Sequence, residues 1–523
     1  MYAVATDHEL ATEAAVKMLR GGGNAFDAAV AAAAVLSVVD PYMSGLGGFG
    51  VALLSHQGKI RGLNFIGTAP RRLKLEELTM EDPWEDYKPS AEGPLSYLVP
   101  GSVAGWGEIS KLGRLSWEKV MEPAVEAAHA HVVTQRIWKF YEGIKDRAAK
   151  HQTNYRTFYE SGRFPMPGEV LRQPELERTL RLLAEEGWTS MYAGTLAQKL
   201  AESVKSQGGV MDEEDLKSFS VKWLDPINVE LMGHEVYSLP QGTGGVSVLE
   251  WLNVIRKLNP PGTWDSPSFA HAFLEAGKLV FRDEDAYNTG KDYIRVPVDL
   301  LLSEDHAEEL ASSVSWKAKF YPKVSKSTYG LHTTSLSVLD GEGNWISMTL
   351  TQMYGFDRNG LLEELGFSLN DGVCYFSLDP KDKERLEPGQ RPRYPLAPSA
   401  ALMGDDVVTL GAAGGWTIPQ TVTQTLLKVL MFGMDVNQAI SSPRYVLRYR
   451  DNSIPYPPGT VVEVEKLPES TVRELENMGH IIGRHTPIDR TPTGAVNGVQ
   501  LRGKTPMAGA EVRREGMSNV FIG

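Results

Sequence analysis

Two adjacent threonines at the start of an alternating stretch are the most chemically suggestive feature of this sequence. Thr333 and Thr334 follow His332, and polar and apolar residues then alternate from Ser335 to Val338. Alternation with a period of two is typical of a β-strand. A threonine hydroxyl becomes a useful nucleophile only when a base activates it. Paired threonines at the start of a strand are also commonplace, so this stretch alone favours a structural role.

A second strand candidate strengthens the case for chemistry. Residues 345–351 alternate in the same way, and the glycine-containing segment 340–344 joins the two stretches. If Leu339 faces Trp345 across this hairpin, Thr333 stands opposite Thr351. The same register places further hydroxyl side chains on that face: Ser335, Ser337, Ser347 and Thr349. A slip of one residue would undo the pairing, so the register is an expectation.

The surrounding sequence predicts helices in the middle of the chain and strands towards both ends. Helical periodicity is clearest in 117–131, 174–186, 196–207, 246–258 and 268–283. Strands are expected at 50–54, 60–65, 407–410, 461–464 and 495–501. Near the start, Thr6 and Glu9 have the spacing of a helix capping box. Helix-rich and strand-rich stretches are mingled without a visible linker, which favours one layered α/β unit.

Composition excludes several classes of function. The 523 residues carry a formal net charge of −13, which argues against a nucleic-acid partner. Cys374 is the single cysteine, which excludes an intramolecular disulfide and a cysteine-rich metal site. The first ten residues lack the pattern of a signal peptide, and the longest apolar run, 28–39, is too short to cross a bilayer. We therefore expect a cytoplasmic protein without a membrane partner.

Two motifs suggest cofactors or metals but lack the necessary context. Residues 45–50 match the glycine fingerprint of dinucleotide-binding proteins, which requires a strand before it and a helix after it. Here a helix precedes and a strand is expected to follow. His129 and His131 would point about 200° apart on a helix, so they do not form a metal site. No cluster of residues implies a metal or an organic cofactor.

Six motifs in a fixed order extend along nearly the whole chain. They are residues 22–29 with 44–48, 99–106, 239–245, 271–283, 333–344 and 411–415. Together they resemble the gamma-glutamyltranspeptidase family, which belongs to the N-terminal nucleophile hydrolases. The resemblance implies an α+β fold, a four-layer αββα sandwich in which helices cover two antiparallel sheets. It also implies a proenzyme that cleaves itself autocatalytically into segments 1–332 and 333–523, which remain interlaced in one globular domain.

The resemblance assigns catalytic roles to four residues. Thr333 would attack the carbonyl group of His332 in the zymogen, and water would then cleave the resulting ester. The freed α-amino group of Thr333, of a type with a reference pKa of about 7.7–8.0, would serve as the general base. Thr351 matches the second threonine of the family, which hydrogen-bonds to the nucleophile. The backbone N–H groups of Gly414 and Gly415 would hold the oxyanion.

The substrate pocket departs from the family pattern. Ile66 stands where the family has an arginine that clamps the α-carboxylate of a γ-glutamyl group, and an alkyl chain cannot replace that clamp. Tyr375 stands in place of an acidic residue, Tyr394 and Pro395 in place of paired serines, and Met353 in place of an asparagine. Glutathione should then be a poor substrate, unless an arginine nearby in sequence captures the carboxylate. The candidates are Arg71, Arg72, Arg391 and Arg393, of which Arg393 is the one we select.

The sequence thus predicts a self-processing threonine amidohydrolase or acyltransferase with an altered, more hydrophobic acyl specificity. Its substrate would be a small-molecule amide or a γ-glutamyl-like compound, and its other partner the second half of its own chain. Two alternatives stay open. One is a genuine glutathione hydrolase or gamma-glutamyltransferase with a rebuilt clamp, and the other is an unprocessed, non-enzymatic scaffold. The sequence leaves the acyl group, the acceptor and the oligomeric state open, a homo-oligomer included.

Overall fold

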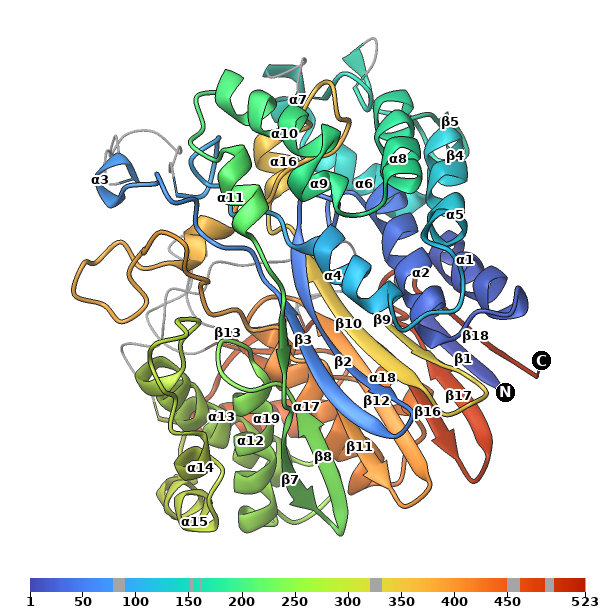
Figure 1. Cartoon of the computed structure of the whole chain (residues 1–523). Coiled ribbons are helices and arrows are strands. Elements are labelled where there is room, and N and C mark those ends of the chain that lie inside the picture. Colours follow the sequence, from blue (N-terminus) through green and yellow to red (C-terminus); the bar gives the residue numbers. More distant parts are fainter. Residues whose placement is uncertain are drawn as a thin grey trace.

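Two antiparallel sheets lie at the centre of the molecule, between two groups of helices (Figure 1). The computed structural model describes residues 1–78, 90–150, 155–159, 162–319, 332–448, 461–484 and 493–522. One sheet has seven strands in the order β18-β1-β9-β10-β2-β3-β6. The other has six, in the order β17-β16-β12-β11-β8-β7. Both termini lie at the same edge, because Tyr2 on β1 pairs with Phe521 on β18.

The strands have the following bounds. The seven-stranded sheet consists of β1 (Tyr2–Thr6), β2 (Phe49–His56), β3 (Lys59–Phe65), β6 (Lys222–Leu224), β9 (Thr333–Leu339), β10 (Trp345–Thr351) and β18 (Met517–Phe521). The six-stranded sheet consists of β7 (Ile227–Leu231), β8 (His234–Ser238), β11 (Ser399–Met403), β12 (Asp406–Ala413), β16 (Ala495–Arg502) and β17 (Thr505–Gly509). Two smaller sheets consist of β4 (His131–Val132) with β5 (Val170–Leu171), and of β13 (Tyr445–Arg448), β14 (Val461–Val464) and β15 (Ile481–Arg484).

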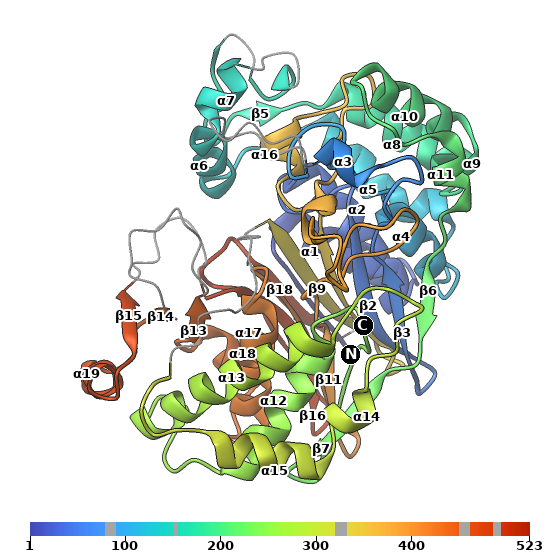
Figure 2. The same ribbon diagram turned by 90° about the vertical axis from the view of Figure 1, so that its left-hand side faces the viewer.

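Helices cover the outer face of each sheet, which gives four layers in total (Figure 2). Against the seven-stranded sheet and around it lie α1 (Glu9–Arg20), α2 (Ala25–Val39), α4 (Ser102–Ser110), α5 (Trp117–His129), α8 (Pro174–Glu186), α9 (Ser190–Ala193), α10 (Thr195–Ser206) and α11 (Glu213–Ser218). Against the six-stranded sheet and around it lie α12 (Gly245–Leu258), α13 (Pro267–Tyr287), α14 (Val298–Leu301), α15 (Glu304–Ser313), α17 (Thr417–Leu430), α18 (Val436–Ser441) and α19 (Glu469–Asn477). The remaining short helices are α3 (Leu75–Leu78), α6 (Gln135–Gly143), α7 (Lys145–Lys150), α16 (Gly355–Asn359) and the 3₁₀ turn η3 (Gly372–Tyr375). This architecture is the α+β sandwich that the sequence predicts.

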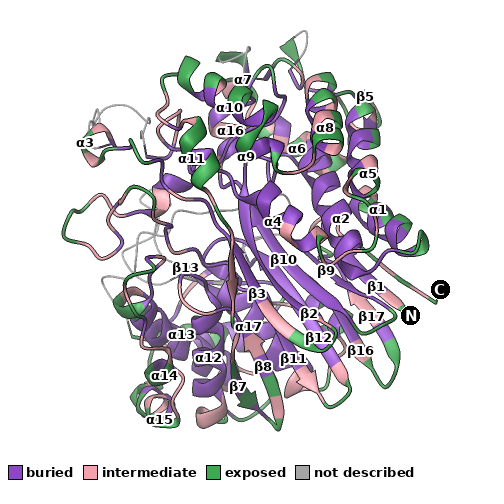
Figure 3. Ribbon diagram, in the orientation of Figure 1, coloured by how far each residue is buried: buried purple, intermediate pink, exposed green. Residues whose placement is uncertain are grey.

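The two faces of the β9–β10 hairpin serve different layers. The apolar side chains of β9 and β10 pack in the same core cluster as α1 and α2: Leu336, Val338, Ile346, Met348 and Leu350. Helix α2 can approach closely because it is rich in alanine, and every one of its residues is buried (Figure 3). A capping box formed by Asn24 and Asp27 fixes where this helix begins. The central strands are therefore buried on both faces.

The hydroxyl face of the hairpin ties the two sheets together. The expected register is confirmed, since Leu339 pairs with Trp345 and Thr333 pairs with Thr351. Ser335 Oγ donates to the carbonyl oxygen of Gly411 on β12 at 3.1 Å. A side chain at Gly411 would meet the Thr349 hydroxyl at 2.9 Å, so the close approach of the sheets depends on this glycine. Most of the hydroxyl row is thus structural, which leaves its first pair, Thr333 and Thr351, for chemistry.

The N-terminus differs from its prediction. The chain opens with strand β1, and α1 begins only at Glu9 with His8 as its N-cap residue. Thr6 is the last residue of β1 and hydrogen-bonds to the Thr12 hydroxyl at 2.9 Å, so the predicted Thr6–Glu9 capping box is wrong. The spacing was misleading because the edge strand β18 pairs with these residues, a contact over more than 500 residues that local patterns do not reveal.

The motifs that we set aside have structural roles. Strand β2 begins at Phe49, inside the glycine fingerprint, so the strand–turn–helix context of a dinucleotide site is absent from this described segment. His131 contacts the carbonyl oxygen of Ala127 at 3.0 Å, whereas His129 contacts Glu177 at 3.2 Å. Across the ranges given above, we find no helix with both the length and the apolar character that a bilayer crossing requires.

Candidate active site

Thr333 lies at the very start of β9, where the hairpin brings it opposite Thr351. Its side chain is buried, with 2% of the residue exposed. The Thr333 hydroxyl donates to Thr351 Oγ1 at 3.2 Å, and the Thr351 hydroxyl donates to the carbonyl oxygen of His332 at 2.5 Å. The N–H group of Met353 donates to the same Thr351 oxygen at 3.0 Å. Thr351 therefore connects the candidate nucleophile to the peptide group that precedes it.

A buried polar cluster fixes the backbone on the other side of Thr333. Arg514 Nη1 donates to the carbonyl oxygen of Thr333 and to Asp7 Oδ2, both at 2.8 Å. Asp7 also accepts the Thr334 hydroxyl at 2.9 Å and the Asn497 side-chain amide at 2.8 Å. Strand β16, the residue that follows β1 and a loop near the C-terminus thus hold the first residues of β9 in place. Nothing in the sequence indicated Asp7, Asn497 and Arg514, because no local pattern links positions so far apart.

A two-glycine turn follows β12, where the family resemblance places the oxyanion site. Gly414 and Gly415 have φ angles of +127° and +60°, a region that favours glycine. A side chain on Gly414 would meet the Thr417 hydroxyl at 2.3 Å and Gly494 Cα at 3.1 Å. Within the described part of the chain, the N–H groups of both glycines donate to no acceptor. The turn therefore presents two backbone donors that a ligand can use.

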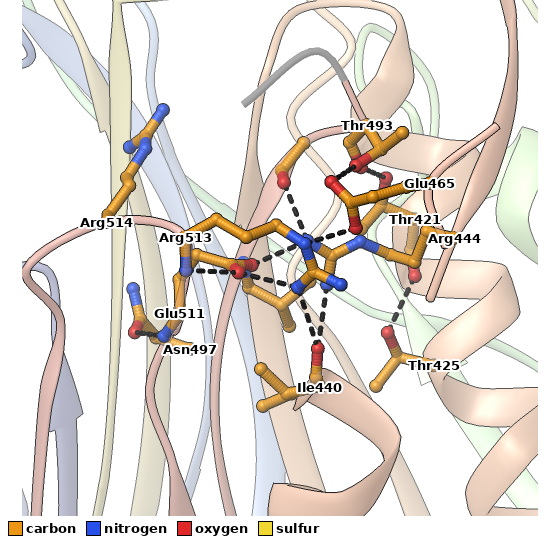
Figure 4. Close-up of polar contacts among 12 residues, drawn as sticks. Thr421, Thr425, Ile440, Arg444, Glu465, Thr493, Asn497, Glu511, Arg513 and Arg514 are labelled. Carbon is orange, nitrogen blue, oxygen red and sulfur yellow. Dashed lines mark hydrogen bonds and ion pairs between the residues drawn. The ribbon is translucent and has the colours of Figure 1, made fainter. Parts of the chain in front are cut away.

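An ion network behind this turn supports the turn itself and the loop that carries Arg514 (Figure 4). Arg444 is fully buried and donates to Glu511 Oε2 at 2.6 Å and to the Gly494 carbonyl oxygen at 2.8 Å. Arg513 donates to Glu511 Oε1 at 2.8 Å and also pairs with Glu465. Burial acts to raise the pKa of Glu511, but the two guanidinium groups outweigh it and hold that pKa below its usual value. The network anchors Gly494 against Gly414. It also holds Arg513, whose neighbour Arg514 binds the Thr333 carbonyl oxygen.

Aromatic side chains occupy positions to which the family resemblance assigned polar substrate ligands. The rings of Tyr375 and Tyr394 stack with their centroids 3.8 Å apart and their planes 20° apart. Phe49 meets Tyr394 edge-on at 4.8 Å. Both tyrosine hydroxyls are buried without a hydrogen-bond partner among the described residues, and burial raises both pKa values well above the usual range. Two neutral phenol groups are therefore available to a ligand.

The remaining predicted pocket residues are apolar and fully enclosed. Ile66 and Met353 are 0% and 1% exposed, and both belong to the core cluster that contains Tyr394. Arg391 Nε donates to the backbone oxygen of Ile66 at 2.9 Å, so this arginine braces the chain at the position of the family's clamp. Met353 has a positive φ of +57°, which fits the sharp bend immediately after β10.

The four arginines considered as a rebuilt clamp all have other partners. Arg393 donates to the Glu284 backbone oxygen at 2.7 Å and to Asp285 Oδ1 at 2.6 Å, and its guanidinium lies 5.3 Å from the centre of the Trp416 ring. Arg71 and Arg72 pair with acidic residues of the loop before α11 and of α11 itself, including Asp212 and Asp215. A substrate carboxylate bound at Arg393 would have to compete with Glu284 and Asp285, which already pair with this arginine.

Comparison with known proteins places this geometry in a family. The family model of gamma-glutamyltranspeptidase matches residues 11–521. The "Glutathione hydrolase-like YwrD proenzyme" of Bacillus subtilis (strain 168) is 31% identical over 502 residues, which is 93% of this chain and 92% of that protein. The "Oxamate amidohydrolase proenzyme" of Klebsiella pneumoniae is 28% identical over 508 residues, which is 94% of this chain and 95% of that protein.

A solved structure supports the same assignment. The crystal structure of cephalosporin acylase from Bacillus halodurans superposes with a TM-score of 0.90 and 29% identity, and covers 100% of this chain and 96% of that one. The activity in its name differs from those in the names of the two sequence relatives, as expected where one fold carries different activities. From its sequence motifs, its αββα architecture and these likenesses, the chain belongs to the gamma-glutamyltranspeptidase family and has the N-terminal nucleophile hydrolase fold.

Proposed function

We propose that the chain is a threonine amidohydrolase that cleaves itself before Thr333 and prefers an acyl group other than γ-glutamyl. The observation that carries this proposal is the chain of contacts from the Thr333 hydroxyl to Thr351 and on to the His332 carbonyl oxygen. The family membership and the amidohydrolase and acylase names of its relatives support it. Cleavage makes Thr333 an N-terminal residue.

The proposed chemistry uses the same hydroxyl twice. In the first use, Thr333 Oγ1 bonds to the His332 carbonyl carbon, the peptide C–N bond breaks, and the hydroxyl proton passes to the departing nitrogen, which becomes a free amine. Water then splits the ester and releases the His332 carboxylate. In the second use, the Thr333 amine takes the hydroxyl proton while Oγ1 attacks a substrate amide. The substrate amine leaves with a proton, and water or another amine removes the acyl group.

The proposed transition state has backbone donors at hand. The free N–H groups of Gly414 and Gly415 are suited to hold the developing oxyanion, a contact worth roughly 3–4 kcal/mol for one donor in comparable enzymes. Because both glycines adopt positive φ values and lack side chains, a substrate carbonyl can approach the backbone closely. The ion network of Arg444 and Glu511 holds the neighbouring segment in place.

The pocket supports an acyl group that is apolar or aromatic and carries an uncharged hydrogen-bond acceptor. Ile66 and Met353 offer no charge, and the stacked Tyr375 and Tyr394 offer aromatic surface with two unused hydroxyl groups. The positive charge of Arg393 is already balanced by Glu284 and Asp285. Truncating one partner of a buried charged contact costs about 2–5 kcal/mol, so a free γ-glutamyl head should bind poorly.

A denaturing gel tests the self-cleavage. Scaling the 57.6 kDa chain by residue number predicts fragments of roughly 37 and 21 kDa. Wild-type protein should give both bands, with Thr-Thr-Ser-Leu at the start of the smaller one, and Thr333→Ala should give one uncut band. Wild-type protein that stays whole would favour the alternative of a non-enzymatic scaffold.

A panel of anilides tests the acyl specificity. Aromatic, simple acyl, glutaryl and γ-glutamyl anilides are compared at equal concentration, with Thr333→Ala as the blank. We expect the γ-glutamyl compound to be turned over most slowly. Fast turnover of the γ-glutamyl anilide and of glutathione would instead establish the alternative of a glutathione hydrolase or gamma-glutamyltransferase with a rebuilt clamp.

A further inference from the structure

The side chain of His332, the residue before the proposed cleavage site, lies in a dedicated polar and aromatic setting. Its Nε2 lies 3.6 Å from Asp357 Oδ2. The Tyr354 ring contacts the imidazole edge-on, with ring centroids 4.8 Å apart. The Phe140 ring of α6 also contacts it edge-on, with centroids 5.4 Å apart. The residue is 8% exposed. An imidazole held by an acid and two aromatic rings has little freedom to turn.

These contacts come from elements that are themselves well supported. Asp357 lies on α16, which begins four residues after Thr351. Phe140 stacks on Tyr42 with ring centroids 3.7 Å apart, and also packs against Phe356 on α16. The surroundings of His332 therefore connect α6, α16 and the segment after α2 into one wall.

The scissile peptide is thus held at three points. Thr351 binds its carbonyl oxygen at 2.5 Å, and Arg514 binds the next carbonyl oxygen, that of Thr333, at 2.8 Å. Asp357 holds the side chain of His332. The first two contacts fix the backbone, whereas the third fixes the rotation of the residue that carries the attacked carbonyl carbon.

We propose that Asp357 is a positioning residue for self-cleavage, acting through its contact with the His332 imidazole to hold the His332 carbonyl group in line with the Thr333 hydroxyl. This inference rests on the proposed function, because it concerns the same peptide bond. It goes beyond it by assigning a residue that serves maturation and is not required for the attack on external substrates, since His332 is separated from Thr333 once the bond is cut.

Geometry explains why such a contact should matter. The attacking oxygen and the attacked carbon belong to adjacent residues, so attack requires the peptide between them to be turned out of its relaxed orientation. Reacting atoms must lie about 3–3.5 Å apart and correctly aligned, and a misplacement of about 1 Å can reduce a rate about 100-fold. An acid that fixes the imidazole reduces the number of orientations that the carbonyl group can sample.

The test follows cleavage of the full chain over time after synthesis of the uncut form. Asp357→Asn keeps the size of the side chain and removes the charge, and we expect it to slow cleavage at least tenfold. Asp357→Glu should cleave faster than Asp357→Asn. Asp379→Asn, the same change at an exposed residue of a different loop, serves as the matched control and should cleave at the wild-type rate. Thermal melting of each uncut protein checks that folding is unchanged.

Two further measurements separate positioning from a general structural role. In a His332→Phe background, Asp357→Asn should slow cleavage no further, because the two residues act as a pair. Once Asp357→Asn protein has been cut, its turnover of the best anilide per cut molecule should be within twofold of wild type. Equal slowing in both backgrounds, or wild-type cleavage by Asp357→Asn, would overturn the inference. A wild-type chain that never cuts would instead defeat the proposed function itself.

Discussion

Thr351 offers the sharpest test of how the site works, because a single hydroxyl joins three contacts. It accepts hydrogen bonds from the Thr333 hydroxyl at 3.2 Å and from the Met353 N–H at 3.0 Å, and it donates to the His332 carbonyl oxygen at 2.5 Å. Thr351→Val replaces that hydroxyl with a methyl group of similar size in a fully buried position. The shape of the site should therefore be preserved while its polarity is lost.

The expected losses differ between folding and self-cleavage. Removing the acceptor leaves the buried Met353 N–H without its partner, which costs about 1–3 kcal/mol of folding free energy. Removing the donor to the attacked carbonyl is comparable to losing an oxyanion donor, about 2.7–4 kcal/mol, so cleavage should slow by about 10² to 10³. Thr351→Ser keeps the hydroxyl and loses only a methyl group, so it should retain most of the cleavage rate.

The assay combines a gel time course with urea unfolding of the uncut proteins. Slow cleavage by Thr351→Val with near-normal cleavage by Thr351→Ser would agree with the geometry, and urea unfolding would separate this difference from the stability that each variant loses. If the Val variant cut itself as fast as wild type, the hydrogen bond to the His332 carbonyl oxygen would have no part in the reaction. The reasoning from the Thr333–Thr351 pair would then fail.

Two other perturbations test the ion network behind the candidate site and a buried acid–histidine pair between α12 and α15. In urea unfolding, Glu511→Gln should destabilise the fold by about 3–5 kcal/mol, because it removes a counter-ion from two buried arginines, Arg444 and Arg513. The control, Glu126→Gln, removes the exposed partner of Lys17 and should cost less than about 1 kcal/mol. The second concerns pH: burial raises the pKa of Glu250 from 4.5 to about 8, and the hydrogen bond to Glu250 raises the pKa of His306. Both groups bind protons more tightly when folded, so stability should fall as pH rises from about 5 to 8. In Glu250→Gln this fall should shrink by about 1 kcal/mol or more, and an unchanged slope would show that the folded protein holds no extra proton there.

The sequence predicted the elements whose patterns are local. The hairpin register emerged from alternation and loop length alone, and it places Thr333 opposite Thr351 as expected. The sequence could not predict that Asp7 and Arg514, which are more than 500 residues apart, form an ion pair beside Thr333. Strands β1 and β18 were missed for the same reason, because each is stabilised by pairing with a distant segment and carries little periodicity of its own.

The pocket was the hardest part to interpret from the sequence. The replacement of charged or polar family residues by Ile66, Tyr375 and Tyr394 predicted an altered specificity, but only the structure shows that the two tyrosines stack on one another. It also shows that Arg393, selected as a substrate ligand, is engaged by Glu284 and Asp285. Side-chain pairing of this kind depends on how loops fold back on a sheet, which residue spacing does not determine.

The candidate catalytic residues and the predicted substrate contacts lie in different parts of the fold. One set can therefore be retained while the other changes. Thr333, Thr351 and the turn at Gly414 belong to strand ends of the two central sheets or directly follow them, where a shift would disturb the hydroxyl contacts between the sheets. Ile66, Tyr375 and Tyr394 lie on segments that follow β3 or precede β11, outside the regular strands. A substitution there changes the residues predicted to contact substrate without moving Thr333. Acyl specificity can therefore diverge within this family at little cost to the cleavage machinery, as the different names of its relatives suggest.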